Sequence, residues 1–223
     1  MRKWGVLISG FYALVVLGLL FPAGIFLVSP EARHWSTFLG ALADTYKQWV
    51  FWIPTVAVLS GQALLLFLSV DTSWRRLRPR MHIYVSCAVA GMLVALLTFA
   101  LVFSLKAAIQ GDKFDHIGDR TITGAQVLGF AGVLWLCWGF VFFAYLRNSS
   151  EAVTRIVSWL LRGSVLELLV AVPCHVIERR RDDCSAPIVT SFGIVTGIAV
   201  MLLSFGPSVL LLYKKRMDAY ARR

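Results

Sequence analysis

The stretch LLRGSVLELLVAVPCHVIERRRDDC, residues 160–184, places side chains that could do chemistry inside an otherwise apolar run. Arg162 and Glu167 are ionisable groups in a segment long enough to cross a bilayer, and an ionisable group inside a membrane is a candidate functional site by default. Glu167 falls near the middle of the segment, and its short side chain cannot reach water at either end. Its carboxyl must therefore be protonated, paired or facing water.

Helical spacing indicates which neighbours share the face of Glu167. At about 100° per residue, Ser164, Glu167, Ala171 and Cys174 form one stripe of small and polar residues, whereas Arg162 lies about 140° around the helix from Glu167. We therefore expect an intramembrane polar site of Arg162, Ser164 and Glu167, although Arg162 could instead extend toward the inner boundary. Partners are expected from other spans, where the available polar groups are Ser60, Gln62, Thr98, Gln126 and Thr196.

Cys174 and Cys184 lie at the end of the same segment, ten positions apart. A disulfide between them would close the loop that holds Arg179 to Arg181 and would stabilise it by about 2–3 kcal/mol in the chain-entropy picture. A redox-active pair and two unpaired thiols are the alternatives, and no CxxC motif is present. Pro173 predicts a kink or the end of the regular helix just before this loop.

Histidines suggest a possible metal site on the same side of the membrane. His34, His116 and His175 all map to that side, near several aspartates, and such a set could bind zinc, copper or iron. No HExxH motif and no histidine pair at i, i+4 is present, so solvated loop histidines are the simpler interpretation. The sequence identifies no cofactor.

The elements that position these residues are membrane spans. Hydrophobic residues make up 58% of the 223-residue chain and charged residues only 15%, too apolar for a soluble domain. A helix of about 20 apolar residues crosses a bilayer. We predict an all-α, polytopic membrane bundle, a single transmembrane domain over residues 1–223, with about six spans at 5–28, 48–70, 82–105, 124–146, 156–177 and 188–213.

Charge predicts the orientation of this bundle. With the N-terminus inside, thirteen of the 22 Lys and Arg residues fall on the cytoplasmic face and eight on the outer face, and Arg162 is buried. An excess of Lys and Arg on the cytoplasmic side places both termini in the cytoplasm. The net charge of +10 belongs to these short loops, so we expect no nucleic-acid partner.

Small residues four positions apart predict where helices approach closely. Such sets occur at Ser9 and Ala13, at Cys87, Gly91 and Ala95, and at Gly193 and Gly197. Cys87 and Cys137 are expected to be packing residues within their spans. No family resemblance is evident.

Two functions remain open from the sequence. The favoured one is a multi-pass protein of a bacterial inner membrane that translocates a small solute or ion, or serves as a subunit of a larger membrane complex. Glu167 would then be a proton or cation site. Six spans are few for a lone transporter, so a homo-oligomer or other membrane subunits are expected as partners. The alternative is a membrane-embedded redox or metal-dependent enzyme with its site at the outer face, at Cys174, His175 and Cys184.

Overall fold

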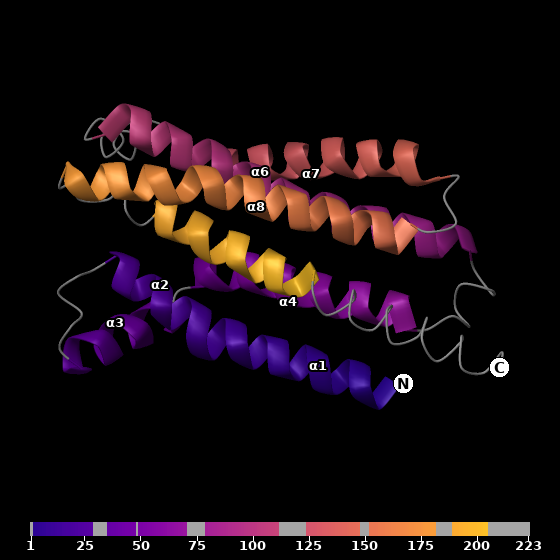
Figure 1. Cartoon of the computed structure of the whole chain (residues 1–223), viewed down its shortest axis with the longest axis horizontal. Coiled ribbons are helices and arrows are strands. Elements are labelled where there is room, and N and C mark those ends of the chain that lie inside the picture. The colour runs from indigo at the N-terminus through magenta and orange to yellow at the C-terminus, as the bar shows by residue number, and fades with distance from the viewer. Residues whose placement is uncertain are drawn as a thin grey trace.

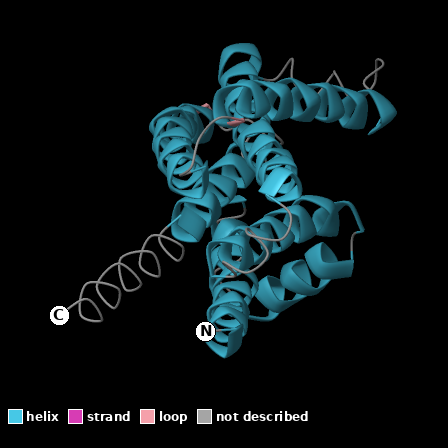
Figure 2. Cartoon of the chain, turned by 90° about the vertical axis from the view of Figure 1, so that its right-hand side faces the viewer, coloured by secondary structure: helices cyan, strands magenta, loops and turns pink. Residues whose placement is uncertain are grey.

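The fold is known from a computed structural model, which describes residues 2–28, 35–47, 49–70, 79–111, 124–147, 152–181 and 189–204. These residues are helical, with no strand among them (Figure 2). The elements are α1 (Arg2–Val15), η1 (Val16–Leu20), α2 (Phe21–Val28), α3 (Trp35–Lys47), α4 (Trp49–Val70), α6 (Pro79–Gln110), α7 (Gly124–Leu146), α8 (Ala152–Arg180) and the Val189–Ser204 helix.

The long helices lie side by side and alternate in direction (Figure 1). One end of the bundle holds the start of α1, the end of α4 and the start of α8, and we call it the Ala152 end. The opposite end, the Arg180 end, holds the ends of α6 and α8 and the start of the Val189–Ser204 helix. The helix termini at the Ala152 end are those that the charge pattern predicts for the cytoplasmic face, and the termini at the Arg180 end are those that it predicts for the outer face.

Four helices in the described residues are long and apolar enough to cross a membrane, and the chain is therefore compatible with a multi-pass membrane protein. They are Val6–Val28, Ile83–Gln110, Leu128–Leu146 and Val153–Arg180. The sharply bent pair of α3 and α4 would make a fifth span, and the Val189–Ser204 helix is a shorter apolar helix. The expected count of six spans and the cytoplasmic termini stay predictions.

Three boundaries differ from those expected. Residues 35–47 were predicted as part of a connector but form α3, and α6 and α8 extend beyond the predicted spans 82–105 and 156–177. Pro173 does not end α8, which continues to Arg180. Because no water satisfies free backbone groups inside a membrane, continuing the helix costs less than leaving several of those groups unpaired.

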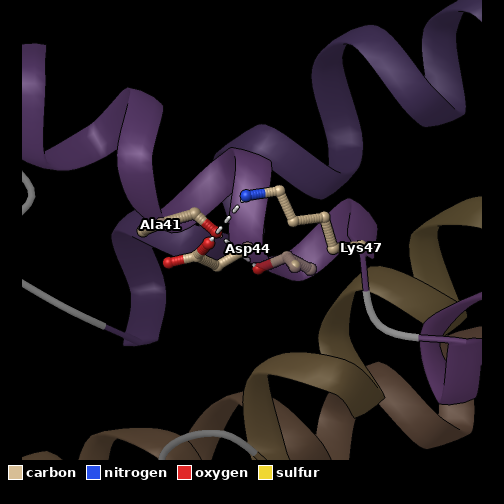
Figure 3. Close-up of polar contacts among 4 residues, drawn as sticks. Ala41, Asp44 and Lys47 are labelled. Carbon is tan, nitrogen blue, oxygen red and sulfur yellow. Dashed lines mark hydrogen bonds and ion pairs between the residues drawn. The ribbon is translucent and has the colours of Figure 1, made fainter.

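α3 lies beside α2 and carries an exposed ion pair. The ammonium of Lys47 lies 3.5 Å from the Asp44 carboxylate, one turn away (Figure 3). Both side chains are about three-quarters exposed, so this pair contributes little to stability. α3 therefore presents a polar side outward while Phe38 is buried and stacks on Phe26 of α2.

The first span contains a π-helical turn whose cause is local. Pro22 has no N–H, and the N–H of Phe21 donates to the carbonyl of Val16 rather than to that of Leu17. The Leu17 carbonyl therefore loses its usual donor, and the hydroxyl of Tyr46 from α3 donates to it instead. This hydrogen bond ties α3 to the irregular point of the first span.

Close packing of α6 on α7 depends on two glycines. A Cβ at Gly91 would lie 2.6 Å from the backbone nitrogen of Gly139 and 2.8 Å from its Cα, so the two backbones are in contact. Cys87 and Ala95, the neighbours of Gly91 at four-residue spacing, are buried beside it. The predicted small-residue contact on this helix is confirmed. The indole N–H of Trp135 also donates to the Ala88 carbonyl, at 2.8 Å.

The Val189–Ser204 helix packs against α1 and α2 on one side and against α8 on the other. The Tyr12 hydroxyl of α1 donates to the Ala199 carbonyl at 2.8 Å, and a Cβ at Gly24 of α2 would lie 2.8 Å from Val195. Its other side packs on α8. This helix therefore positions the groups that face α8.

Candidate functional site

A continuous buried stripe runs along α8. Ser164, Glu167 and Ala171 are fully buried, and Cys174 is nearly so, whereas Leu169 on the other side is 67% exposed. The stripe that helical spacing predicts is therefore confirmed. It also extends further than expected, because Glu178 continues the same spacing and is fully buried.

Glu167 occupies the centre of this stripe and packs against two glycines of the Val189–Ser204 helix. A Cβ at Gly193 would lie 2.9 Å from one carboxyl oxygen of Glu167, and a Cβ at Gly197 would overlap the other. The Ser104 hydroxyl of α6 lies 2.9 Å from the same Gly193 position. The carboxyl is thus enclosed where α6, α8 and the Val189–Ser204 helix meet.

Neither oxygen of Glu167 has a hydrogen-bond partner among the described residues, and the Ser104 hydroxyl has none either. No described Lys, Arg or His side chain forms an ion pair with Glu167. The hydrogen-bond partner that we expected from another span is therefore not found among the described residues. Instead, the Val189–Ser204 helix leaves room for the carboxyl, because Gly193 and Gly197 have no side chains there.

The three predicted site residues are not all brought together. Ser164 lies one turn from Glu167 on the buried stripe, and its hydroxyl donates to the Leu161 carbonyl at 2.9 Å. Arg162 is exposed on a different side of α8. The structure therefore separates Arg162 from the carboxyl that it was expected to accompany.

A second buried polar cluster lies eleven residues further along α8, at the Arg180 end. The Thr190 hydroxyl donates to the Glu178 carboxylate at 2.7 Å and lies 2.9 Å from Nδ1 of His175. Glu178 and Thr190 are fully buried and His175 is 8% exposed. His175 is therefore a buried residue of α8 and not a solvated loop histidine.

One of the arginines at this end ties α8 to α6. The Arg181 guanidinium donates to the Ala108 carbonyl of α6 at 2.8 Å. Arg179 and Arg180 lie in the last turn of α8, where positive charge interacts favourably with the helix dipole.

The predicted disulfide finds no support. Cys174 is a free, buried cysteine, and Cys184 lies outside the described residues, so the bridge stays a prediction. Cys87 is buried as expected of a packing residue, but Cys137 is exposed on α7.

The metal site also stays a prediction. His34 and His116 lie outside the described residues. Within the part of the chain that the structure describes, no three His, Cys, Asp or Glu side chains are grouped closely enough to hold a metal ion. His175, the remaining candidate, is hydrogen-bonded to Thr190 instead.

Sequence reasoning missed Glu178 and Thr190. A signal for Glu178 was present, because the 3–4 spacing of residues 167, 171 and 174 places residue 178 next on the same stripe. Thr190 gives no such signal, since its role depends on the packing of two helices.

No family model matches this chain, and neither a curated protein nor a solved structure matches it.

Proposed function

We propose that this chain is a multi-pass protein of a cell membrane that moves protons, with Glu167 as the group that carries them. The observation that supports this is the position of Glu167. It lies at the middle of the Val153–Arg180 span and is fully buried, and neither carboxyl oxygen has a hydrogen-bond partner within the part of the chain that the structure describes. Carboxyl groups held inside a membrane bundle in this way typically belong to ion or proton pathways.

Free energies favour a carboxyl that can be loaded and unloaded. Protonating a carboxyl of ordinary acidity at pH 7 costs about 4 kcal/mol. Keeping an ionised, unpaired carboxylate buried costs several kcal/mol even after the surroundings relax. The two costs are similar in size, so a modest change in hydration around Glu167 is enough to reverse its protonation state.

The surroundings of Glu167 suit a proton better than a metal cation. Hard cations such as Ca²⁺ and Mg²⁺ take six or more oxygen ligands. Near Glu167, the Ser104 hydroxyl lies at the Gly193 position, and the Ser164 hydroxyl, one turn away on α8, is bonded to the Leu161 carbonyl. Gly193 and Gly197 are in contact with the carboxyl and leave little room for a coordination shell. A proton needs neither a set of oxygen ligands nor room for a coordination shell.

The outer surface supports assembly within the membrane. Large apolar side chains are exposed along α7, including Leu136 and Phe140, each 72% exposed. Such a surface suits contact with lipid or with other membrane helices. We therefore propose that the protein acts as a homo-oligomer or as a subunit of a larger membrane complex.

Proton flux into proteoliposomes tests the proposal. Vesicles contain a pH-sensitive dye, and a potassium gradient with valinomycin supplies the driving potential. We expect the wild-type protein to acidify the lumen faster than protein-free vesicles do. Glu167→Gln keeps the size of the side chain but cannot exchange a proton, so its flux should fall to the protein-free level.

Ser60→Ala is the matched control, because Ser60 is an exposed polar residue of α4 whose hydroxyl bonds only to the nearby Ala57 carbonyl. Its flux should equal that of the wild type. Flux through Glu167→Gln as fast as through the wild type, or no flux through the wild type, would contradict the proposal.

A further inference from the structure

The hydrogen bonds at the Arg180 end have a defined direction. A threonine hydroxyl carries one hydrogen, and that of Thr190 is given to Glu178. The bond between Thr190 and Nδ1 of His175 must then use the Nδ1 hydrogen, because the hydroxyl can only accept. A neutral His175 therefore carries its proton on Nδ1, and its Nε2 is an open proton acceptor.

These two hydrogen bonds, from His175 to Thr190 and from Thr190 to Glu178, form a path along which a proton can pass. A proton that binds Nε2 of His175 releases the Nδ1 proton to the Thr190 oxygen. The hydroxyl passes its own hydrogen to Oε2 of Glu178, so one O–H bond forms as another breaks. No electron is transferred, and the imidazole returns to its first tautomer when the ring flips. The donor and acceptor distances, 2.9 Å and 2.7 Å, allow both transfers.

Glu178 lies on the same face of α8 as Glu167, and His175 is buried about 80° around the helix from it. His175 is eight residues from Glu167, about 12 Å along the helix axis. Ser191, next to Thr190, and Ser104, against Gly193, are buried hydroxyls without a partner among the described residues, on the two helices that face α8. The Ser104 hydroxyl lies at the same Gly193 position as an oxygen of Glu167, and Ser191 follows Thr190 in the sequence.

Among the described residues, most charged groups near these hydrogen bonds belong to α8. Glu178 and Arg179 lie within one turn of His175, and Cys174 is its neighbour in sequence. Of the helices packed against it, α6 carries Lys106 near this end. The Val189–Ser204 helix carries no ionisable residue.

We propose that His175, Thr190 and Glu178 form a proton relay that connects the Arg180 end of the bundle with Glu167. This inference rests on the proposed function. In it, His175 accepts the proton that leaves Glu167, Thr190 passes it on, and Glu178, which lies three residues nearer the Arg180 end than His175, holds it before its release there. The three residues are proton-transfer groups, separate from the carrier itself.

Proton flux in the same proteoliposomes tests the relay. Thr190→Val keeps the shape of the side chain and removes the hydroxyl, so the flux should fall by on the order of 10–100-fold, toward the effect typical of losing a positioned proton-transfer group. Thr190→Ser restores the hydroxyl and should stay within about twofold of the wild type. Thr196→Val is the matched control, since Thr196 is a buried threonine of the same helix that lines an apolar cavity with Val58 and Val195.

A second variant separates proton transfer from folding. His175→Ala should lose flux to a similar extent, and added imidazole should restore part of it, because the free base can occupy the space of the missing ring. A purely structural role for His175 would give no such rescue.

The outcomes distinguish the two proposals. If Glu167→Gln abolishes flux but Thr190→Val leaves it unchanged, the relay is overturned and the carrier stands. If Thr190→Ser is as slow as Thr190→Val, or imidazole fails to rescue His175→Ala, the cluster is structural and the relay is overturned. If Glu167→Gln has no effect on flux, the proposed function fails, whatever the Thr190 variants do.

Discussion

The contact between Gly197 and Glu167 can be tested by adding one methyl group. In Gly197→Ala the new Cβ would overlap Oε2 of Glu167 and lie 2.9 Å from Cγ of Leu168. Leu168 is partly exposed and can move aside, but Glu167 is enclosed. Overpacking of this kind costs about 1–3 kcal/mol, which exceeds the gain of about 1 kcal/mol or less from replacing glycine in a helix.

The matched control is Gly132→Ala on α7. Gly132 also lies within a membrane-spanning helix, but a Cβ added there meets no atom within 4 Å. It should be neutral or slightly stabilising. The measurement is unfolding by SDS in mixed micelles, followed by circular dichroism, with all variants at one protein-to-detergent ratio.

A double mutant identifies the carboxyl as the cause. Glu167→Ala removes the oxygen that the new methyl group would overlap, so adding Gly197→Ala to Glu167→Ala should cost less than adding it to the wild type. The coupling free energy between the two positions should reach about 1–3 kcal/mol. Equal effects of Gly197→Ala in both backgrounds, or a Gly197→Ala variant as stable as Gly132→Ala, would refute the described packing of Glu167.

Two further predictions concern the fold. Tyr46→Phe removes the donor to the Leu17 carbonyl and should lower stability by about 1–3 kcal/mol, while Pro22→Ala, which restores a backbone N–H, should recover part of this loss in the same unfolding measurement. Gly91→Ala places a Cβ 2.6 Å from the backbone nitrogen of Gly139, and since backbone cannot move aside as a side chain can, it should destabilise by about 3 kcal/mol or more and separate α6 from α7; normal stability would contradict the close approach.

Much of the fold follows from local patterns. Apolar length predicted the helical spans, because a segment of about 20 apolar residues has few alternatives to a membrane helix. The 3–4 spacing of Ser164, Glu167, Ala171 and Cys174 predicted the buried stripe of α8, since helix geometry fixes which side chains share a face. These features depend only on residues near one another in the sequence.

Other features depend on packing, and the sequence did not predict them. Helix α3 is short and mixed in polarity, so it lacks the apolar length that identifies a span. Arg162 has a side chain long enough to point toward the carboxyl or away from it, and only the position of the neighbouring helices decides between the two. Thr190 takes its partners from α8, fifteen and twelve residues earlier in the chain.

The central site shows how two separate patterns can describe one contact. The spacing of Gly193 and Gly197 predicts a packing surface, and the position of Glu167 predicts a polar partner from another span. In the structure the glycines pack against the carboxyl itself, so the residues that allow the helices to approach also determine how tightly Glu167 is enclosed. Any movement of the Val189–Ser204 helix away from α8 would expose the carboxyl to water and favour its ionised form. Under the proposed function, the same glycines that stabilise the packed state would control when Glu167 binds or releases a proton.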